Sequence, residues 1–184
     1  MVRALFIIVL ISAVSNGIGQ EDNRDWRINT TLAFSPGLLT ERTQSIQLHG
    51  YLGYQKEKIH VRGDGFYLLN QFGDRPRFSM NHQLYFGAFY HFLDKKFQPY
   101  IGFQPGVAIA QSSEYAALNE DTGELEYRVA TSPVGSPVAG FSFYGEKLFY
   151  LFFETRYIFG KHTTNTYPTF LDEWRFSFGL GFHF

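Results

Sequence analysis

The sequence predicts an all-β fold, an eight-stranded antiparallel up-and-down transmembrane β-barrel. The clearest sign is the stretch 174–184, where a large apolar residue occupies every second position and Arg, Ser, Gly, Gly and His lie between. Successive side chains of a β-strand point to opposite faces, so this strand has one apolar face and one small or polar face. Nearly every other predicted strand repeats the pattern, which leaves no second apolar layer for a soluble sandwich. The apolar faces are therefore expected to contact lipid and the polar faces to line a narrow lumen.

The composition agrees with this fold and excludes several classes of function. Aromatic residues make up 19% of the 184 residues, yet the mean hydropathy is slightly negative. Alternating strands produce this combination because averaging cancels their two faces. The formal net charge of −1 and the lack of a basic block give no case for nucleic acid. Since the chain has no Cys, it has no disulfide framework, thiolate metal site or cysteine nucleophile.

The amino terminus has the pattern of a secretory signal peptide. Arg3 is followed by an apolar run over 4–14, and Gly17 and Gly19 are the small residues before a cut ahead of Gln20. An uncleaved membrane anchor is the alternative, but the apolar run is shorter than the roughly 20 residues that span a bilayer. We therefore expect residues 1–19 to be a signal peptide and residues 20–184 to be a single barrel domain.

The alternation of side chains and the intervening turn residues predict eight strands in order. They cover about 26–35, 45–55, 59–70, 78–92, 98–111, 134–144, 148–159 and 174–184. Pro36-Gly37 is expected to end the first strand. In the third strand, Asn70 falls in the inward set, while Gly63 and Gly65 fall in the outward set and suggest a bulge or bend.

Prolines make the fifth and sixth strands the least regular of the eight. A proline inside a ladder is unfavourable because it has no N–H to donate. Pro105 lies within the fifth strand, and Pro133 and Pro137 lie near the start of the sixth. The seventh strand and the last strand alternate without interruption.

The connections between these strands are expected to alternate in length. They are long at 36–44, short at 55–58, medium at 71–77, short at 93–96, long at 112–130, short at 145–147 and long at 160–172. Short periplasmic turns and longer extracellular loops are typical of membrane barrels, and an even number of strands puts both termini on the short-turn side. The first and last strands must pair, because an open edge is not tolerated in hydrocarbon. A soluble lipocalin-like barrel is the alternative, and it would hide its large residues inside.

Aromatic residues near the predicted strand ends suit the girdle of a membrane barrel. These residues are Trp26, Tyr54, Tyr90, Tyr100, Tyr157 and Trp174.

The signal peptide, the eight alternating strands and the terminal Phe184 together resemble the small outer-membrane barrels of the OmpA, OmpX and OmpW kind. The same features resemble the porin-like outer membrane protein beta-barrel families of Gram-negative bacteria. Pro99-Tyr100-Ile101-Gly102 is similar to a strand start common in these families, and the resemblance covers essentially all of residues 20–184. It implies a place in the bacterial outer membrane and contact with its lipid and lipopolysaccharide. It also implies assembly by periplasmic chaperones and the barrel-assembly machinery, with Phe184 as part of the assembly signal.

The inward faces of the predicted strands carry many charged and amide side chains. An eight-stranded barrel is just wide enough for its side chains to fill the interior, and charges buried there need partners. We therefore expect a network that plugs the lumen, with a small conducting path as the alternative. The network is predicted to comprise Arg27, His49, Arg62, Asp64, Gln83, Gln104, Glu154, Arg156 and Arg175.

Catalytic, cofactor and metal sites are not predicted. Lipid A deacylases and palmitoyltransferases share this architecture, but they need a Ser activated by His. The His-x-Ser spacing of the deacylases is absent, and His162-Thr163-Thr164 is the nearest approach. The six His residues show no metal-ligand spacing, and His82 is expected at the membrane interface.

The loop at 112–130 is the most acidic segment of the chain. A solvated loop is the simpler interpretation, and contact with a divalent cation or lipopolysaccharide is the more specific one. The oxygen spacing of an EF-hand is not met. The acidic residues are Glu114, Glu120, Asp121, Glu124 and Glu126.

Together these observations predict a non-enzymatic, monomeric integral outer-membrane barrel with a structural or surface-interaction role. A narrow pore or transport barrel for small or apolar solutes is the alternative, and a lipid A-modifying enzyme is a third reading.

Overall fold

The computed structural model describes residues 26–39, 43–73, 77–93, 95–114, 116–145, 148–163 and 167–184. The expected signal peptide over 1–19 lies outside the described residues. No helix among the described residues is both long enough and apolar enough to cross a membrane.

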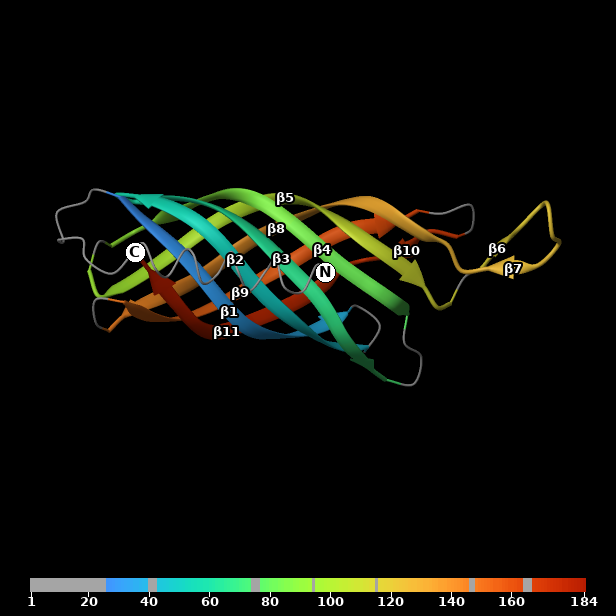
Figure 1. The fold of residues 1–184 in the computed structure, drawn as a ribbon, viewed down its shortest axis with the longest axis horizontal. Helices are drawn as coiled ribbons and strands as arrows, with labels where there is room; N and C mark the ends of the chain where they lie inside the picture. Colours follow the sequence, from blue (N-terminus) through green and yellow to red (C-terminus); the bar gives the residue numbers. More distant parts are fainter. Residues whose placement is uncertain are drawn as a thin grey trace, which may run out of the picture.

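In the part of the chain that the structure describes, eight long strands form one closed antiparallel cylinder (Figure 1). Each strand pairs with its neighbours in sequence, and the last pairs with the first through contacts such as Leu180↔Leu32. The predicted eight-stranded barrel is therefore confirmed. The long strands are β1 (Trp26–Leu39), β2 (Gln44–Lys56), β3 (Ile59–Phe72), β4 (Phe78–His91), β5 (Phe97–Ser112), β8 (Val129–Tyr144), β9 (Phe149–His162) and β11 (Glu173–His183). Short pieces are β6 (Ala117–Leu118), β7 (Leu125–Glu126) and β10 (Thr169–Phe170).

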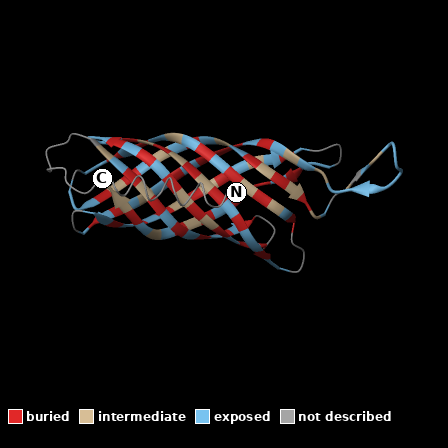
Figure 2. Cartoon of the chain, in the orientation of Figure 1, coloured by how far each residue is buried: buried red, intermediate tan, exposed pale blue. Residues whose placement is uncertain are grey.

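Burial alternates along every long strand, which gives the wall a chequered pattern (Figure 2). Apolar side chains such as Leu32, Phe86 and Leu180 are more than half exposed on the outside, while Arg62 and Glu154 are buried inside. Most of the large apolar residues therefore face outward, as a membrane barrel requires. This arrangement is the reverse of a soluble lipocalin-like barrel.

Prolines are accommodated within the strands and do not end them. β1 continues through Pro36 to Leu39, so the prediction that Pro36-Gly37 ends the first strand is wrong. β5 and β8 likewise run through Pro105 and Pro137. The ladders skip two pairs beside each of these prolines, for example between Tyr85↔Gly106 and Ala88↔Phe103. Successive residues of a strand hydrogen-bond to the neighbouring strands on alternate sides. A proline has no N–H, so it removes a backbone hydrogen bond on one side only, and the ladder on the other side persists.

A β-bulge near the end of β3 reverses which of its residues face inward. Ile46 pairs with Asn70 and Gln47 with Leu68, so Leu69 has no partner across the ladder. The extra residue turns Asn70 outward and Gln71 inward, which contradicts the predicted inward position of Asn70. The ladder runs without a shift past Gly63 and Gly65, so the bulge that was one of the two expected irregularities, a bulge or a bend, is not found there.

The two ends of the barrel differ. Phe184 and Ile28 exchange backbone hydrogen bonds of 3.0 and 3.1 Å at the end that also carries the connections 57–58, 92–96 and 145–148. We call this the turn end and the opposite one the loop end (Figure 1). The connection predicted as long at 36–44 covers only 40–43, because β1 and β2 are longer than expected. At the loop end, the connections 113–128 and 163–172 are the long ones.

Candidate functional site in the barrel lumen

The charges at the centre of the lumen come from two strands on opposite sides of the barrel. β3 and β9 are four strands apart in either direction around the closed sheet. β3 contributes Arg62 and Asp64, and β9 contributes Glu154 and Arg156. The spacing of two residues puts both side chains of each strand on the inward face. The cluster therefore spans the lumen from wall to wall.

These four side chains form a closed ring of ion pairs, which we call the four-charge ring. Arg62 donates to Asp64 Oδ2 (3.0 Å) and Glu154 Oε2 (2.5 Å). Arg156 donates to Asp64 Oδ1 (3.1 Å) and Glu154 Oε1 (2.6 Å). All four residues are at most 2% exposed, and their formal charges cancel. Such pairing is what buried charges require.

Neighbouring side chains donate further hydrogen bonds to both carboxylates of the four-charge ring. His49 Nε2 donates to Asp64 Oδ1 (2.9 Å), and the Gln104 amide donates to the other oxygen of the same carboxylate. Tyr100 donates its hydroxyl to Glu154 Oε2 (3.1 Å). The sequence placed Tyr100 in the aromatic girdle, and the structure corrects this. It is 3% exposed inside the lumen because its parity along β5 is opposite to that of the outward Ile101.

Aromatic side chains flank the guanidinium groups of Arg62 and Arg156 in the four-charge ring. The Arg62 guanidinium carbon lies 4.2 Å from the Tyr51 ring centre and 4.0 Å from that of Phe89. Arg156 lies 4.5 Å from the Phe66 ring centre. Such cation–π contacts are strongest where water is excluded. They fill the space around the charges with packed side chains.

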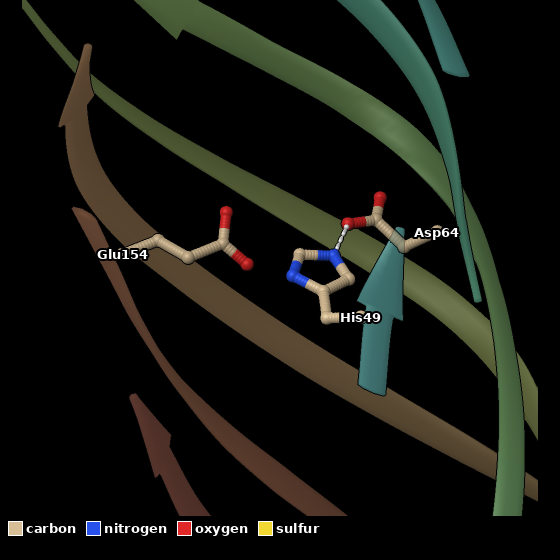
Figure 3. A group of neighbouring side chains, drawn as sticks. All are labelled: His49, Asp64 and Glu154. Atoms are coloured by element: carbon tan, nitrogen blue, oxygen red, sulfur yellow. Dashed lines mark hydrogen bonds and ion pairs between the residues drawn. The ribbon is translucent and has the colours of Figure 1, made fainter. Parts of the chain in front are cut away.

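His49, Asp64 and Glu154 also have the geometry of a candidate metal site (Figure 3). One ligand atom from each lies within 4.8 Å of the others. However, both carboxylates are already neutralised by the two guanidinium groups. A divalent cation would therefore leave two excess positive charges buried. The arrangement favours ion pairing over metal binding.

A second neutral pair lies towards the loop end. Arg175 donates to Glu173 Oε2 (2.6 Å) and to Gln83 Oε1 (3.1 Å). The Ser45 hydroxyl donates to the other oxygen of Glu173. Gln83 Nε2 in turn donates to Asn81 Oδ1 (2.9 Å). Arg175 and Gln83 thus form a second hydrogen-bonded group that adjoins the four-charge ring, because Arg175 is the ladder partner of Arg156 and both guanidinium carbons lie 4.5 Å from the Phe66 ring centre.

The turn end of the lumen is lined by amides and aromatic hydroxyls. Asn29 donates to Gln55 Oε1 (3.0 Å), and the Tyr51 and Tyr150 hydroxyls share a hydrogen bond of 2.6 Å. Arg27 belongs to this region, because its guanidinium carbon lies 5.7 Å from the Tyr144 ring centre. The sequence grouped Arg27 with the central charges, and the structure places it at the end of the barrel instead.

The loop end of the lumen is closed by an apolar cluster that the sequence did not reveal. Leu171 was assigned to a loop, yet it is fully buried. Its N–H bonds to the Gly160 carbonyl (3.0 Å), while Asp172 Oδ1 accepts from the Gly160 N–H (3.1 Å), which holds the segment against β9. No apolar alternation marks this segment. The cluster comprises Leu39, Phe66, Phe78, Tyr85, Ala108, Ala110, Val134, Ile158 and Leu171.

His162, the nearest approach to a catalytic base, lies beside this cluster. Its ring meets the Phe78 ring edge-on, with the ring centres 6.1 Å apart. No described side chain hydrogen-bonds to its ring nitrogens. Thr164 lies outside the described residues. Thr169 is the ladder partner of His162, but in the described part of the chain no hydroxyl is hydrogen-bonded to this base, as acyl transfer needs.

No protein-family model and no curated protein matches the sequence. Solved structures do match it. Neisserial surface protein A is 15% identical with a TM-score of 0.64, covering 89% of this chain and 100% of its own. The amino-terminal barrel domain of Pseudomonas aeruginosa OprF is 14% identical with a TM-score of 0.54, covering 88% and 98%. OprG of the same organism is 13% identical with a TM-score of 0.53, covering 86% and 95%. The chain therefore has the fold of the small eight-stranded outer-membrane β-barrels.

Proposed function

We propose that the protein is an integral barrel of the bacterial outer membrane, closed to ions, that presents its loop end at the cell surface. In this proposal residues 1–19 are removed as a signal peptide and residues 20–184 form the mature barrel. The termini and short turns face the periplasm, as in other barrels of this architecture. Its role is structural or one of surface interaction and does not involve catalysis.

The observation that carries this proposal is the four-charge ring between β3 and β9. It crosses the lumen, its charges cancel, and its members are almost completely buried. An ion that passed through would have to separate charge pairs, and breaking one buried pair costs about 3–5 kcal/mol. The apolar cluster at the loop end adds a second barrier, since most of its side chains have no polar group to offer a hydrated ion.

The outer wall supports the membrane placement. Trp174 and Tyr157 lie with ring centres 5.2 Å apart near the loop end, and Tyr54 and Tyr90 are exposed towards the turn end. Aromatic side chains at both borders suit the interfaces of a bilayer, with lipid and lipopolysaccharide covering the apolar band between. The closure of β1 on β11 leaves no free edge in the wall, which favours a monomer.

Single-channel recording in a planar bilayer tests the proposal. The folded protein, with insertion verified by protease protection, should give no conductance steps. The double variant Arg62→Ala/Glu154→Ala removes a neutral pair from the ring and should conduct. The outward-facing Leu32→Ala serves as the matched control and should stay silent. Reproducible steps from the unmodified protein would overturn the closed lumen.

Passage of small apolar solutes is a second candidate function, favoured by the apolar side chains in the loop-end half of the lumen. An apolar cluster lies in this part of the lumen, and the adjacent β8·β9 ladder skips two pairs beside Pro137. Outside this seam lies an apolar groove lined by residues that include Pro133, Gly135 and Phe159. Entry of a small apolar dye into vesicles should then be faster with the barrel than without it. Equal rates would remove this candidate.

A further inference from the structure

Between β5 and β8 the chain leaves the barrel wall and forms a hairpin that projects beyond the loop end (Figure 1). β6 and β7 pair through Leu118↔Leu125 and Ala117↔Glu126. The turn between them is closed by Asn119 N–H to the Glu124 carbonyl and Gly123 N–H to the Asn119 carbonyl, both 2.8 Å. Gly123 has a φ of 72°, which glycine adopts without strain. The segment is thus an organised hairpin.

One face of this hairpin is apolar and uncovered. Leu118 and Leu125 are cross-strand partners and so lie on the same face. They are 59% and 70% exposed, and Tyr127, the residue that follows β7, is 50% exposed. Figure 2 shows the hairpin as exposed over most of its length. We call these three residues the hairpin face. A two-stranded hairpin is marginally stable alone, so covering this face would stabilise it.

The segment that carries the hairpin face is strongly acidic. Residues 113–128 contain five carboxylates and one guanidinium, a formal charge of −4, whereas the whole chain carries −1. Glu126 lies 3.7 Å from Arg128, and Glu114 lies 3.6 Å from Arg77, so these two are partly neutralised. The remaining acids, Glu120, Asp121 and Glu124, are exposed around the turn. Negative charge therefore borders the apolar face.

We propose that the hairpin face is a docking site for a cationic protein surface that carries an apolar pocket. Charge complementarity selects this partner, because a second copy of the hairpin and the anionic headgroups of a membrane both carry the same sign of charge. The pocket would receive Leu118 and Leu125, and Lys or Arg around it would meet the acids of the turn. The proposal deepens the surface-interaction role given above and rests on the loop end lying outside the cell.

Binding of defined peptides to the folded protein tests this proposal. The probes are three short fluorescent peptides that alternate Lys with Leu, Lys with Ser, and Glu with Leu. They are titrated against the barrel in phosphatidylcholine nanodiscs, with empty nanodiscs subtracted. The Lys/Leu peptide should bind about tenfold more tightly than either of the others, which corresponds to roughly 1.4 kcal/mol.

Two variants separate the apolar contribution from the charged one. Leu118→Ser/Leu125→Ser should reduce Lys/Leu binding to the level of the Lys/Ser peptide. Glu120→Gln/Asp121→Asn/Glu124→Gln should weaken both cationic peptides and reduce the salt dependence of binding. Glu57→Gln and Leu93→Ser, exposed at the turn end, are the matched controls and should change neither. Undiminished binding by the double Leu variant, or equal binding of the Glu/Leu peptide, would overturn the proposal.

A separate measurement tells a failure of this proposal from a failure of the proposed function. The chain has no Cys, so Thr122→Cys introduces a single thiol at the hairpin turn. A membrane-impermeant maleimide should label it in intact cells if the loop end lies outside. Labelling without peptide binding would refute the docking site alone. Peptide binding without labelling would leave the hairpin face a binding surface but place it on the wrong side of the membrane.

Discussion

Replacing Glu154 with Gln should lower the free energy of unfolding by about 3–5 kcal/mol, the usual cost of removing one partner from a buried ion pair. Glu154 accepts hydrogen bonds from Arg62 (2.5 Å), Arg156 (2.6 Å) and Tyr100 (3.1 Å). The variant keeps the side-chain shape but leaves two guanidinium groups with the single carboxylate of Asp64. One positive charge then remains uncompensated where the exposed fraction is at most 2%.

The assay is urea unfolding in phosphatidylcholine vesicles, with the folded fraction read from gel mobility. The double variant Glu154→Gln/Arg156→Gln restores neutrality and should regain much of the loss, giving a coupling energy of about 2 kcal/mol or more in the double-mutant cycle. Glu57→Gln makes the same chemical change at an exposed site and should stay within about 0.5 kcal/mol of the parent. A cost below about 1 kcal/mol for Glu154→Gln would mean that water solvates the charges. The argument for a closed lumen would then fail.

Three further changes probe the wall and its assembly. Gly181→Ala should destabilise the barrel by about 1–3 kcal/mol in the same urea assay, because the new Cβ would lie 2.1 Å from the buried Tyr150 ring. Gly145→Ala, which meets nothing within 4 Å, should be neutral, and equal costs would refute the packing argument. Leu32→Arg puts a charge on the lipid-facing wall and should cost about 2–4 kcal/mol in vesicles; a loss under 1 kcal/mol would place this residue away from the bilayer centre. Deleting Phe184 should lower the amount of barrel in cell membranes more than the refolding yield in vitro, and equal losses would refute a role as assembly signal.

The sequence predicts the faces of the strands well because the period of a strand is two and one side of this wall contacts lipid. The seventh strand, for example, has Phe153 outside and Glu154 and Arg156 inside, as expected. Prediction fails where a local irregularity shifts the phase. The unpaired Leu69 turns Asn70 outward, and no residue type in that segment predicts this change of face.

Prolines misled the prediction for a different physical reason. Pro36 was expected to end its strand because it has no N–H. Its side chain lies on the outward face, and its missing bond would have gone to β11, where the ladder skips two pairs. The ladder to β2 runs past Pro36 without interruption. A proline thus costs a single ladder bond, and the second ladder of an interior strand keeps the strand intact.

Part of the candidate site could be predicted from the order of the strands. In a closed eight-stranded barrel the third and seventh strands must lie opposite each other, so Arg62 and Asp64 must face the side of the lumen that holds Glu154 and Arg156. Their heights along the axis depend on the stagger of the strands, which side-chain alternation does not determine. Leu171 was missed because its burial depends on the tertiary path of a segment with no periodic pattern.

The order of charges along the two strands explains why the ring closes. β3 and β9 both run from the turn end to the loop end, and β3 carries Arg62 before Asp64, while β9 carries Glu154 before Arg156. Each charge therefore meets an opposite charge across the lumen and another two residues along its own strand. Reversing one strand's order would set like charges against each other across the lumen. Because every member has both kinds of partner, no single side-chain rotation opens a path without leaving a buried charge unpaired, and this favours a closed barrel over a gated one.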